Sequence, residues 1–300
     1  MNTIKLLFVG TRPKTLLICV SPFILGSAFA FNVNRYINIP LNVLTLTLFL
    51  SLQIFANYSN DYFDYINGKD SEKREGPLKI THSNKLPFYT MQHILMLLVW
   101  FILILTLIII HFSQQNELLL LTTTVLAILS AWLYTGGPLP LGYIGLGEIL
   151  VFVSFGPLSV LTSYYIQIEN SYLNLETLVV SISCGLIAAS ILVINNIRDK
   201  VSDRITQKNT SSVLFGKSFG QIEYVTTLLS GCLSSFILIT KDSHNLPLLA
   251  SLCAILIRAF KLSRSVFLTS NADDYNSLLA NTSQFLLMYS CLIGFSCGGR

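Results

Sequence analysis

The sequence predicts an all-α integral membrane protein with nine transmembrane helices. Of its 300 residues, 52% are hydrophobic and only 11% are charged, whereas a soluble domain carries about 25% charged residues. Apolar stretches of about 17–25 residues are long enough to cross a bilayer as helices. In chain order, nine such stretches cover roughly residues 15–32, 41–57, 91–112, 117–134, 143–167, 174–195, 223–240, 246–262 and 278–297.

These stretches differ in how sharply the sequence bounds them. The first follows a short basic segment without the layout of a cleavable signal peptide, so it is expected to stay as a span. The second and sixth run directly into polar segments rich in Asn and Asp, and the fourth, fifth and ninth have gradual edges. Most stretches are unbroken in their middle, with Pro22 and Pro157 as exceptions. A Gly- and Pro-rich uncharged loop, 135–142, joins the fourth stretch to the fifth.

The basic residues predict which side of the membrane each loop occupies. Nine spans place the termini on opposite sides, and every Lys and Arg except Arg35, Lys241 and Arg300 falls on the side of the N-terminus. By the positive-inside rule, the N-terminus and two long polar loops at about 58–90 and 196–222 are cytoplasmic. The net charge of +4 therefore reports orientation, and it gives no argument for nucleic-acid binding.

Two acidic segments begin where even-numbered spans leave the membrane. In the first, Asn57, Asp61 and Asp64 recur at i, i+4 and i+7, which places them on one face of a continuing helix, and a further acid follows at Asp70. The second segment, NNIRDKVSD, has a similar helical spacing of polar residues, with Asn195, Asp199 and Asp203 at i, i+4 and i+8.

Oxygen ligands with little sulfur or histidine suit hard cations, and Mg²⁺ usually takes one or two carboxylates together with waters and substrate phosphates. Two facing clusters of this kind could hold Mg²⁺ ions that bridge to a diphosphate. The alternative is that these are solvated loop acids that cap helices. That alternative fits a single Asp better than two helix-spaced clusters interleaved with bases.

The interleaved bases suit phosphate oxygens, because Arg presents a planar fork and Lys a point charge. The candidates are Arg12, Arg74, Lys79, Arg198 and Lys208. The positive-inside rule by itself explains cytoplasmic bases, and we prefer it for Lys200, Arg204, Lys217 and the other remaining bases.

Two further residues have a functional and a structural interpretation. Glu148 lies early in the fifth stretch, where an acid marks a functional site or a carboxyl hydrogen-bonded between helices. Tyr134 ends the fourth stretch, either in the interfacial aromatic belt or on the wall of a reaction cavity.

Four segments carry a resemblance to the UbiA superfamily of membrane prenyltransferases. They are TRPKTL (11–16), NYSNDYFDYINGKDSEKREGPLK (57–79), YTGGPLPLGYIGLGE (134–148) and NNIRDKVSDRITQKNT (195–210). Many aromatic prenyltransferases place the third acid four residues after the second, which here is Gly68. This chain has Asp70, six residues after Asp64, and in this it resembles the branch that prenylates 1,4-dihydroxy-2-naphthoate. Gln207, where a Gly often stands, and Ser211–Ser212, where Leu is usual, depart from the pattern.

The resemblance implies a nine-helix bundle around a central cavity, with residues 1–300 forming a single prenyltransferase domain. It also implies transfer of a polyprenyl group from polyprenyl diphosphate to 1,4-dihydroxy-2-naphthoate, with loss of CO₂ and diphosphate, in menaquinone biosynthesis. Such an enzyme is Mg²⁺-dependent and lies in the inner, or cytoplasmic, membrane. Its partners are the two substrates and membrane lipid.

The site residues follow from the same resemblance. The expected metal ligands are Asp61, Asp64, Asp70, Asp199 and Asp203. Catalysis is expected from Asp61, Asp64, Asp199, Arg198, Lys208 and Tyr134, with Tyr62 as a second aromatic candidate. Substrate binding is expected from Asn57, Asn195, Asn196, Arg12, Arg74, Lys79 and Glu148.

Two other functions remain open on the sequence. Another UbiA-type enzyme, for instance one that prenylates 4-hydroxybenzoate, would share the acids but not the spacing of the third one. A cation-binding transporter would also carry intramembrane acids, yet transporter helices are often broken near the bilayer midplane. Here the acids cluster at one face and most spans are continuous.

Overall fold

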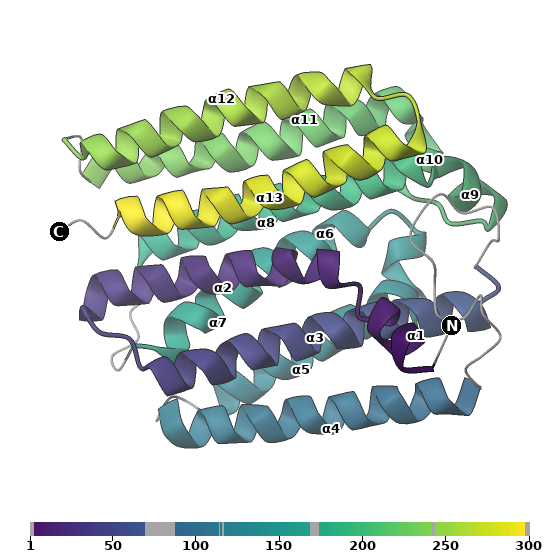
Figure 1. Cartoon of the computed structure of the whole chain (residues 1–300), viewed down its shortest axis with the longest axis horizontal. Helices are drawn as coiled ribbons and strands as arrows, with labels where there is room; N and C mark the ends of the chain where they lie inside the picture. The colour runs from purple at the N-terminus through teal and green to yellow at the C-terminus, as the bar shows by residue number, and fades with distance from the viewer. Residues whose placement is uncertain are drawn as a thin grey trace.

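The computed structural model describes residues 3–69, 88–113, 115, 117–168, 174–241 and 244–297. Within these ranges all regular elements are helical, and nine segments are long and apolar enough to cross a membrane (Figure 1). The prediction of an all-α protein with nine spans is confirmed. The segments are Thr15–Asn34, Ile39–Ile66, Phe88–Ser113, Glu117–Thr135, Gly147–Ile166, Leu175–Arg198, Lys217–Thr240, Leu246–Leu268 and Ala272–Ser296.

The helices follow one another with short connections among the described residues. The first half contains α1 (Thr3–Gly10), α2 (Pro13–Asn34), α3 (Ile39–Ile66), α4 (Phe88–Ser113), α5 (Glu117–Thr135) and the 3₁₀ turn η2 (Leu141–Tyr143). Next come α6 (Gly147–Val153), the π-helical segment η3 (Ser154–Leu158), α7 (Ser159–Ile166) and α8 (Leu175–Arg198). The chain ends with α9 (Lys200–Ile205), α10 (Ser211–Phe215), α11 (Lys217–Ser234), η4 (Ser235–Lys241), α12 (Leu246–Leu268) and α13 (Ala272–Ser296).

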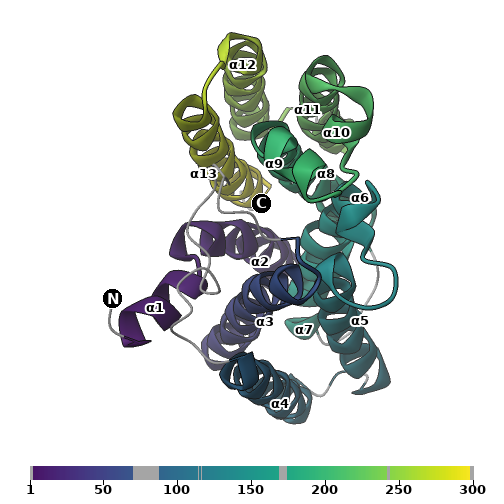
Figure 2. The same cartoon turned by 90° about the vertical axis from the view of Figure 1, so that its right-hand side faces the viewer.

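A ring of helices forms the centre of the molecule. α2 packs on α3, α3 on α5, α5 on α6, α6 on α8, α8 on α13, and α13 returns to α2 (Figure 2). Helix α4 lies outside this ring against α3 and α5, while α11 and α12 cover α8 and α13. The outer helices leave large apolar side chains exposed, for example Leu97, Trp100 and Ile104 on α4. Such a surface suits contact with lipid.

Asparagine side chains cap the N-termini of four of the long helices. Asn38 accepts a hydrogen bond from Leu41 N at the start of α3, and Asn174 accepts from Glu176 N and Thr177 N at the start of α8. Asn245 and Asn271 cap α12 and α13 in the same way. Each cap satisfies backbone N–H groups that have no partner inside the helix.

The fifth span is not one regular helix. It was predicted to cover about 143–167, but it begins at Gly147 and changes to π-helical geometry at Ser154–Leu158 before α7 continues. Pro157 lies inside that segment. Because proline lacks an N–H and its ring clashes with the preceding turn, a local π-bulge is an expected response.

Helices α2 and α7 approach too closely at Gly26 for any larger side chain. A Cβ there would collide with the carbonyl oxygen of Val160 and would lie 2.7 Å from Ser163 Cβ. We expect Gly26→Ala to destabilise the fold by about 1–3 kcal/mol, because both obstacles belong to packed helix. Thermal unfolding in detergent measures this, with Val43→Ala on the exposed face of α3 as the control. Equal unfolding temperatures for the two variants would contradict the assignment of this contact.

Candidate active site

A cavity of about 250 Å³ lies inside the ring of helices. Its walls come from α2, α3, α5, the fifth span, α8 and α13, and they are mostly apolar. The polar lining residues include Arg12, Gln53, Asn57, Asn60, Tyr134 and Asn195. Arg12, Asn57 and Asn60 lie near the end of α3 that carries the first acids, and Asn195 lies near the end of α8. The cavity therefore has an apolar body and a polar end.

The first acidic segment is part of α3. As the spacing predicts, the helix continues into the polar segment at about 58–90 and ends at Ile66. Asn57, Asp61 and Asp64 share a buried face, as their spacing predicts, with Asp61 0% and Asp64 1% exposed. Burying two carboxylates is costly unless each has a cationic or hydrogen-bonding partner.

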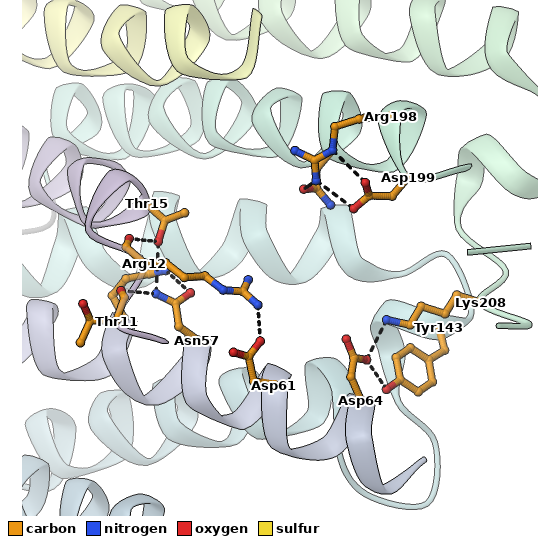
Figure 3. Close-up of polar contacts among 12 residues, drawn as sticks. Thr11, Arg12, Thr15, Asn57, Asp61, Asp64, Tyr143, Arg198, Asp199 and Lys208 are labelled. Carbon is orange, nitrogen blue, oxygen red and sulfur yellow. Dashed lines mark hydrogen bonds and ion pairs between the residues drawn. The ribbon is translucent and has the colours of Figure 1, made fainter. Parts of the chain in front are cut away.

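Arg12 is the partner of Asp61 (Figure 3). It lies between α1 and α2 with φ 48°, a left-handed backbone conformation uncommon for residues other than glycine. Asn57, one turn before Asp61, donates to Thr11 O at 2.9 Å and to Thr15 Oγ1 at 3.1 Å. Thus the segment TRPKT and the first acidic segment, distant in sequence, form one polar wall.

Asp64 receives two hydrogen bonds on the same oxygen. Tyr143 Oη donates at 2.6 Å and Lys208 Nζ at 2.7 Å to its Oδ1 (Figure 3). Lys208 also lies over the Tyr143 ring, 5.0 Å from its centroid. Burial first, and then the negative charge of Asp64, raise the pKa of Tyr143 well above the usual value. The tyrosine therefore stays a protonated donor throughout any working pH range.

Backbone hydrogen bonds hold the loop that carries Lys208, one at Lys208 itself and one at Asn209. Lys208 N donates to Asp203 O at 2.8 Å, and Asn209 N donates to Tyr143 O at 2.8 Å. Gln207, which departs from the resembled pattern, has φ 56°. Glycine adopts that conformation without strain, which gives a physical reason for the glycine usual there.

The second acidic segment faces the first from the end of α8. Arg198 forms a bidentate pair with Asp199, from Nε to Oδ1 at 2.8 Å and from Nη2 to Oδ2 at 2.9 Å (Figure 3). Arg198 also donates to Asn195 Oδ1 at 2.7 Å and to Asn276 Oδ1 of α13 at 2.8 Å. The side chains of the ion pair are 2% and 3% exposed.

Asp199 interrupts the helix that was predicted to continue. It is the C-cap of α8, and α9 starts at Lys200, so the expected single face across Asn195, Asp199 and Asp203 is divided between two helices. Asp199 is buried, whereas Asp203 on α9 is half-buried. The predicted loop 196–222 accordingly contains the end of α8, α9, α10 and the start of α11.

Glu148 is hydrogen-bonded between helices. Its Oε1 accepts from Asn196 Nδ2 at 2.6 Å and from Ser211 Oγ at 3.1 Å, and Ser211 Oγ also lies 2.7 Å from Glu223 Oε2. Of the described residues, those that line the cavity do not include Glu148 or Asn196, and the same holds for Asp61, Asp64, Arg198, Asp199 and Lys208. The geometry matches the structural interpretation of Glu148, in which it joins the fifth span to α8 and α10.

The two aromatic candidates occupy different places. Tyr134 lines the cavity, packed against Gly142 and Gly147 so closely that a Cβ on either glycine would meet its ring at about 3 Å. Tyr62 instead stacks on Phe88 at 4.9 Å and packs with Met91 away from the cavity. Asp70, Arg74 and Lys79 lie outside the described residues.

Several site contacts come from residues that the sequence did not single out. Tyr143 belongs to the segment GYIGLGE, so its motif was visible although its role was not. Asn276 lies in a stretch without any recognised pattern, and nothing in the sequence marks it as a partner of Arg198. Thr11 and Thr15 flank Arg12 and hold Asn57.

Removing the Tyr143 hydroxyl tests its contact with Asp64. We expect Tyr143→Phe to lower turnover about tenfold, the effect of a charge-assisted hydrogen bond worth about 1.5 kcal/mol. The alkaline side of the pH profile should keep its position, because the raised pKa keeps Tyr143 protonated there. Tyr65→Phe, the same change on an exposed tyrosine of α3, is the control. Equal rates for the two variants would contradict a role for the hydroxyl.

Comparison with known proteins decides the family. The sequence model of the UbiA prenyltransferase family matches residues 19–288. The chain belongs to the UbiA prenyltransferase family. It is therefore a multi-pass membrane prenyltransferase, as the resemblance implied.

Relatives and solved structures agree with this membership. A 1,4-dihydroxy-2-naphthoate octaprenyltransferase from Haemophilus influenzae is 32% identical over 98% of this chain and 96% of the relative. A protein of the same name from Escherichia coli is 35% identical over 77% of this chain and 76% of its own. A UbiA homologue from Archaeoglobus fulgidus bound to GPP and Mg²⁺ has the same fold, with a TM-score of 0.71, 13% identity and coverage of 96% and 99% of the two chains.

Proposed function

We propose that this UbiA-family protein transfers a polyprenyl group from polyprenyl diphosphate to 1,4-dihydroxy-2-naphthoate, with loss of CO₂ and diphosphate, giving demethylmenaquinol, the reduced form of demethylmenaquinone. Two buried acid walls carry the proposal: the first consists of Asn57, Asp61 and Asp64 on α3, and the second of Asn195 and Asp199 at the end of α8. With their paired bases they lie at the polar end of an apolar cavity. The activity named for the two bacterial relatives supports the choice of acceptor. We treat residues 1–300 as one domain, because α2 and α3 from the first part of the chain and α13 from its end line the same cavity.

The donor set fits a hard divalent cation. No group of three or more His, Cys, Asp or Glu residues at metal-binding distance occurs among the described residues. The carboxylates instead stand on two walls, which suits Mg²⁺ because it takes one or two carboxylates and completes its shell with water and substrate phosphates. Asp61, Asp64, Asp199 and Asp203, with Asp70, would hold it. When bound, Mg²⁺ supplies positive charge to the leaving diphosphate.

Basic residues of the chain would stabilise the diphosphate together with the metal. Arg12, Lys208 and Arg198 are already held by acids at the polar end, so their charges are positioned before substrate arrives. Such fixed groups stabilise the negative charge that develops on the leaving diphosphate oxygens, and they need not move to do so. This electrostatic stabilisation is usually the largest contribution to catalysis. We also propose that Arg74 and Lys79 contribute, and that Asn57 and Asn195 hold the substrates in place.

The apolar body of the cavity would receive the first isoprene units and protect the allylic carbocation from water. Tyr134 presents its ring to the cavity, where an aromatic face favours a cation. The electron-rich naphthoate ring attacks the carbocation, and the ring carboxyl leaves as CO₂. The tail extends toward lipid, in keeping with a protein whose outer helices expose apolar side chains.

The same proposal includes orientation. Because Lys and Arg residues concentrate on the side of the N-terminus, that side and the acid walls would face the cytoplasm. A bacterial-type cytoplasmic membrane would then supply the lipid substrate from within the bilayer and the naphthoate from the cytoplasm.

Labelled acceptor distinguishes this function from that of another UbiA-type enzyme. Membranes that contain the protein would be incubated with an all-trans polyprenyl diphosphate and carboxyl-labelled 1,4-dihydroxy-2-naphthoate or 4-hydroxybenzoate. We expect label from the naphthoate to appear as CO₂ in step with unlabelled lipid product. Labelled lipid from 4-hydroxybenzoate, with no reaction of the naphthoate, would overturn the choice of acceptor.

A further inference from the structure

A second cleft lies at the same end of the bundle as the acid walls, between α8, α9, α11 and the start of α13. Figure 1 shows α9, α10 and the α12–α13 connection together at this end. The residues that line the cleft are Ile197, Arg198, Lys200, Val201, Arg204, Ile205, Lys217, Ser270, Asn271, Ala272 and Tyr275. Four of them are basic, and among the described lining residues none is acidic.

The charge of the cleft comes from three of these bases. Arg198 is balanced by its bidentate pair with Asp199, so Lys200, Arg204 and Lys217 set the sign. Asp203, Asp273 and Asp274 occur on the same helices, but they do not belong to the lining. The positive-inside rule requires bases on this side of the membrane, yet it does not require them to converge on one concave site.

One of the bases is held in position. Lys217 Nζ donates to Thr269 O at 3.2 Å and lies 5.6 Å from the centroid of the Tyr275 ring. Lys200 reaches toward the same place, because its Nζ would be 4.0 Å from a Cβ on Gly216, the residue before α11. The cleft thus receives one ammonium group from the start of α11, beside Thr269, and one from α9, beside Gly216.

A hydrogen bond connects this cleft with the central cavity. Arg198 lines the cleft and donates to Asn195 Oδ1 at 2.7 Å, and Asn195 lines the cavity. Arg198 on the cleft side and Asn195 on the cavity side are therefore in direct contact, with Asp199 held on the guanidinium. An anion in the cleft would lie close to the side chain that we place at the leaving diphosphate.

We propose that this cleft is an anion site for phosphate groups, supplied either by the released diphosphate or by a phospholipid head group. Several positive charges around a cleft with exposed apolar side chains, Val201 and Ile205, suit a multiply charged phosphate better than a simple carboxylate. The diphosphate source rests on the proposed function, whereas the site itself does not.

The test compares two double variants of the full chain that remove the same charge at the same end of the bundle. Lys200→Gln/Arg204→Gln alters the cleft, and Lys261→Gln/Arg264→Gln alters exposed bases on α12. Inorganic pyrophosphate binding is measured by calorimetry without divalent metal, in detergent and in zwitterionic phosphatidylcholine vesicles. Binding to anionic phosphatidylglycerol vesicles is measured in parallel. Unfolding temperatures close to wild type verify the fold, and Arg204→Gln alone serves if the double variant unfolds.

We expect the cleft variant to bind one of the probes about tenfold more weakly, in line with the modest strength of exposed ion pairs, and the α12 variant to match wild type. Weaker pyrophosphate binding identifies the product as the source, and weaker binding to anionic vesicles alone identifies the head group. Equal affinities of the two variants for both probes would overturn the proposal. This test measures binding and not turnover. Its result therefore stays valid even if the protein fails to prenylate the naphthoate.

Discussion

Asp64→Asn is expected to lower turnover by at least about 100-fold while the protein stays folded. The substitution keeps the shape of the side chain and its ability to accept from Tyr143 and Lys208, but it removes the charge that would bind metal. Losing one preorganised electrostatic contact of this kind typically costs about 10²–10³ in rate. Turnover of polyprenyl diphosphate in membranes at saturating substrate measures the effect.

Asp273→Asn is the matched control for this variant. Asp273 is an exposed acid in the first turn of α13 and takes no part in either acid wall. It should retain nearly full activity, and both variants should unfold close to the wild-type temperature. If Asp64→Asn remained folded and turned over at a rate near that of Asp273→Asn, Asp64 would not be a metal ligand.

Arg198→Ala is expected to have the largest effect on stability. The change removes the bidentate guanidinium from the buried carboxylate of Asp199, and breaking a buried ion pair from one side costs about 3–5 kcal/mol. It also leaves the oxygens of Asn195 and Asn276 without their donor. The loss should be visible as a lower midpoint of thermal unfolding in detergent, together with loss of turnover.

The double variant Arg198→Met/Asp199→Leu separates stability from catalysis. Replacing both members of a buried pair by apolar side chains of similar size is often neutral for stability. We therefore expect most of the unfolding temperature to return while turnover stays lost. A double variant as active as the wild type would show that neither residue acts on the substrates, and one as unstable as Arg198→Ala would contradict the ion-pair explanation.

The first acid wall could be predicted from the sequence because it depends on one helix. The i, i+4, i+7 spacing of Asn57, Asp61 and Asp64 has its expected meaning, since α3 continues well past the apolar stretch. The second acid wall was predicted less well, because its prediction also depended on one continuous helix. Its spacing assumes an unbroken helix, and the helix stops at Asp199.

The partners of the acids could not be predicted, because tertiary packing chooses them. Lys208 is 144 residues from Asp64, and Asn276 is 78 residues from Arg198. Hydropathy places the spans, and the basic residues indicate their orientation, but neither says which base lies against which acid. The cleft beside α9 shows the same limit. Lys200, Arg204 and Lys217 are indistinguishable in the sequence from the other bases on the side of the N-terminus, and only folding brings them together.

Product formation from 1,4-dihydroxy-2-naphthoate, with and without Mg²⁺, tests the central claim most directly. Purified protein in lipid would receive an all-trans polyprenyl diphosphate and the naphthoate, and the lipid extract would be analysed by mass spectrometry. The account predicts demethylmenaquinol, detected as such or as demethylmenaquinone after oxidation in air, with Mg²⁺ and none in the presence of a chelator. The same yield with the chelator would contradict the metal role of the acid walls, and folded protein that gave no product with Mg²⁺ would contradict the proposed reaction.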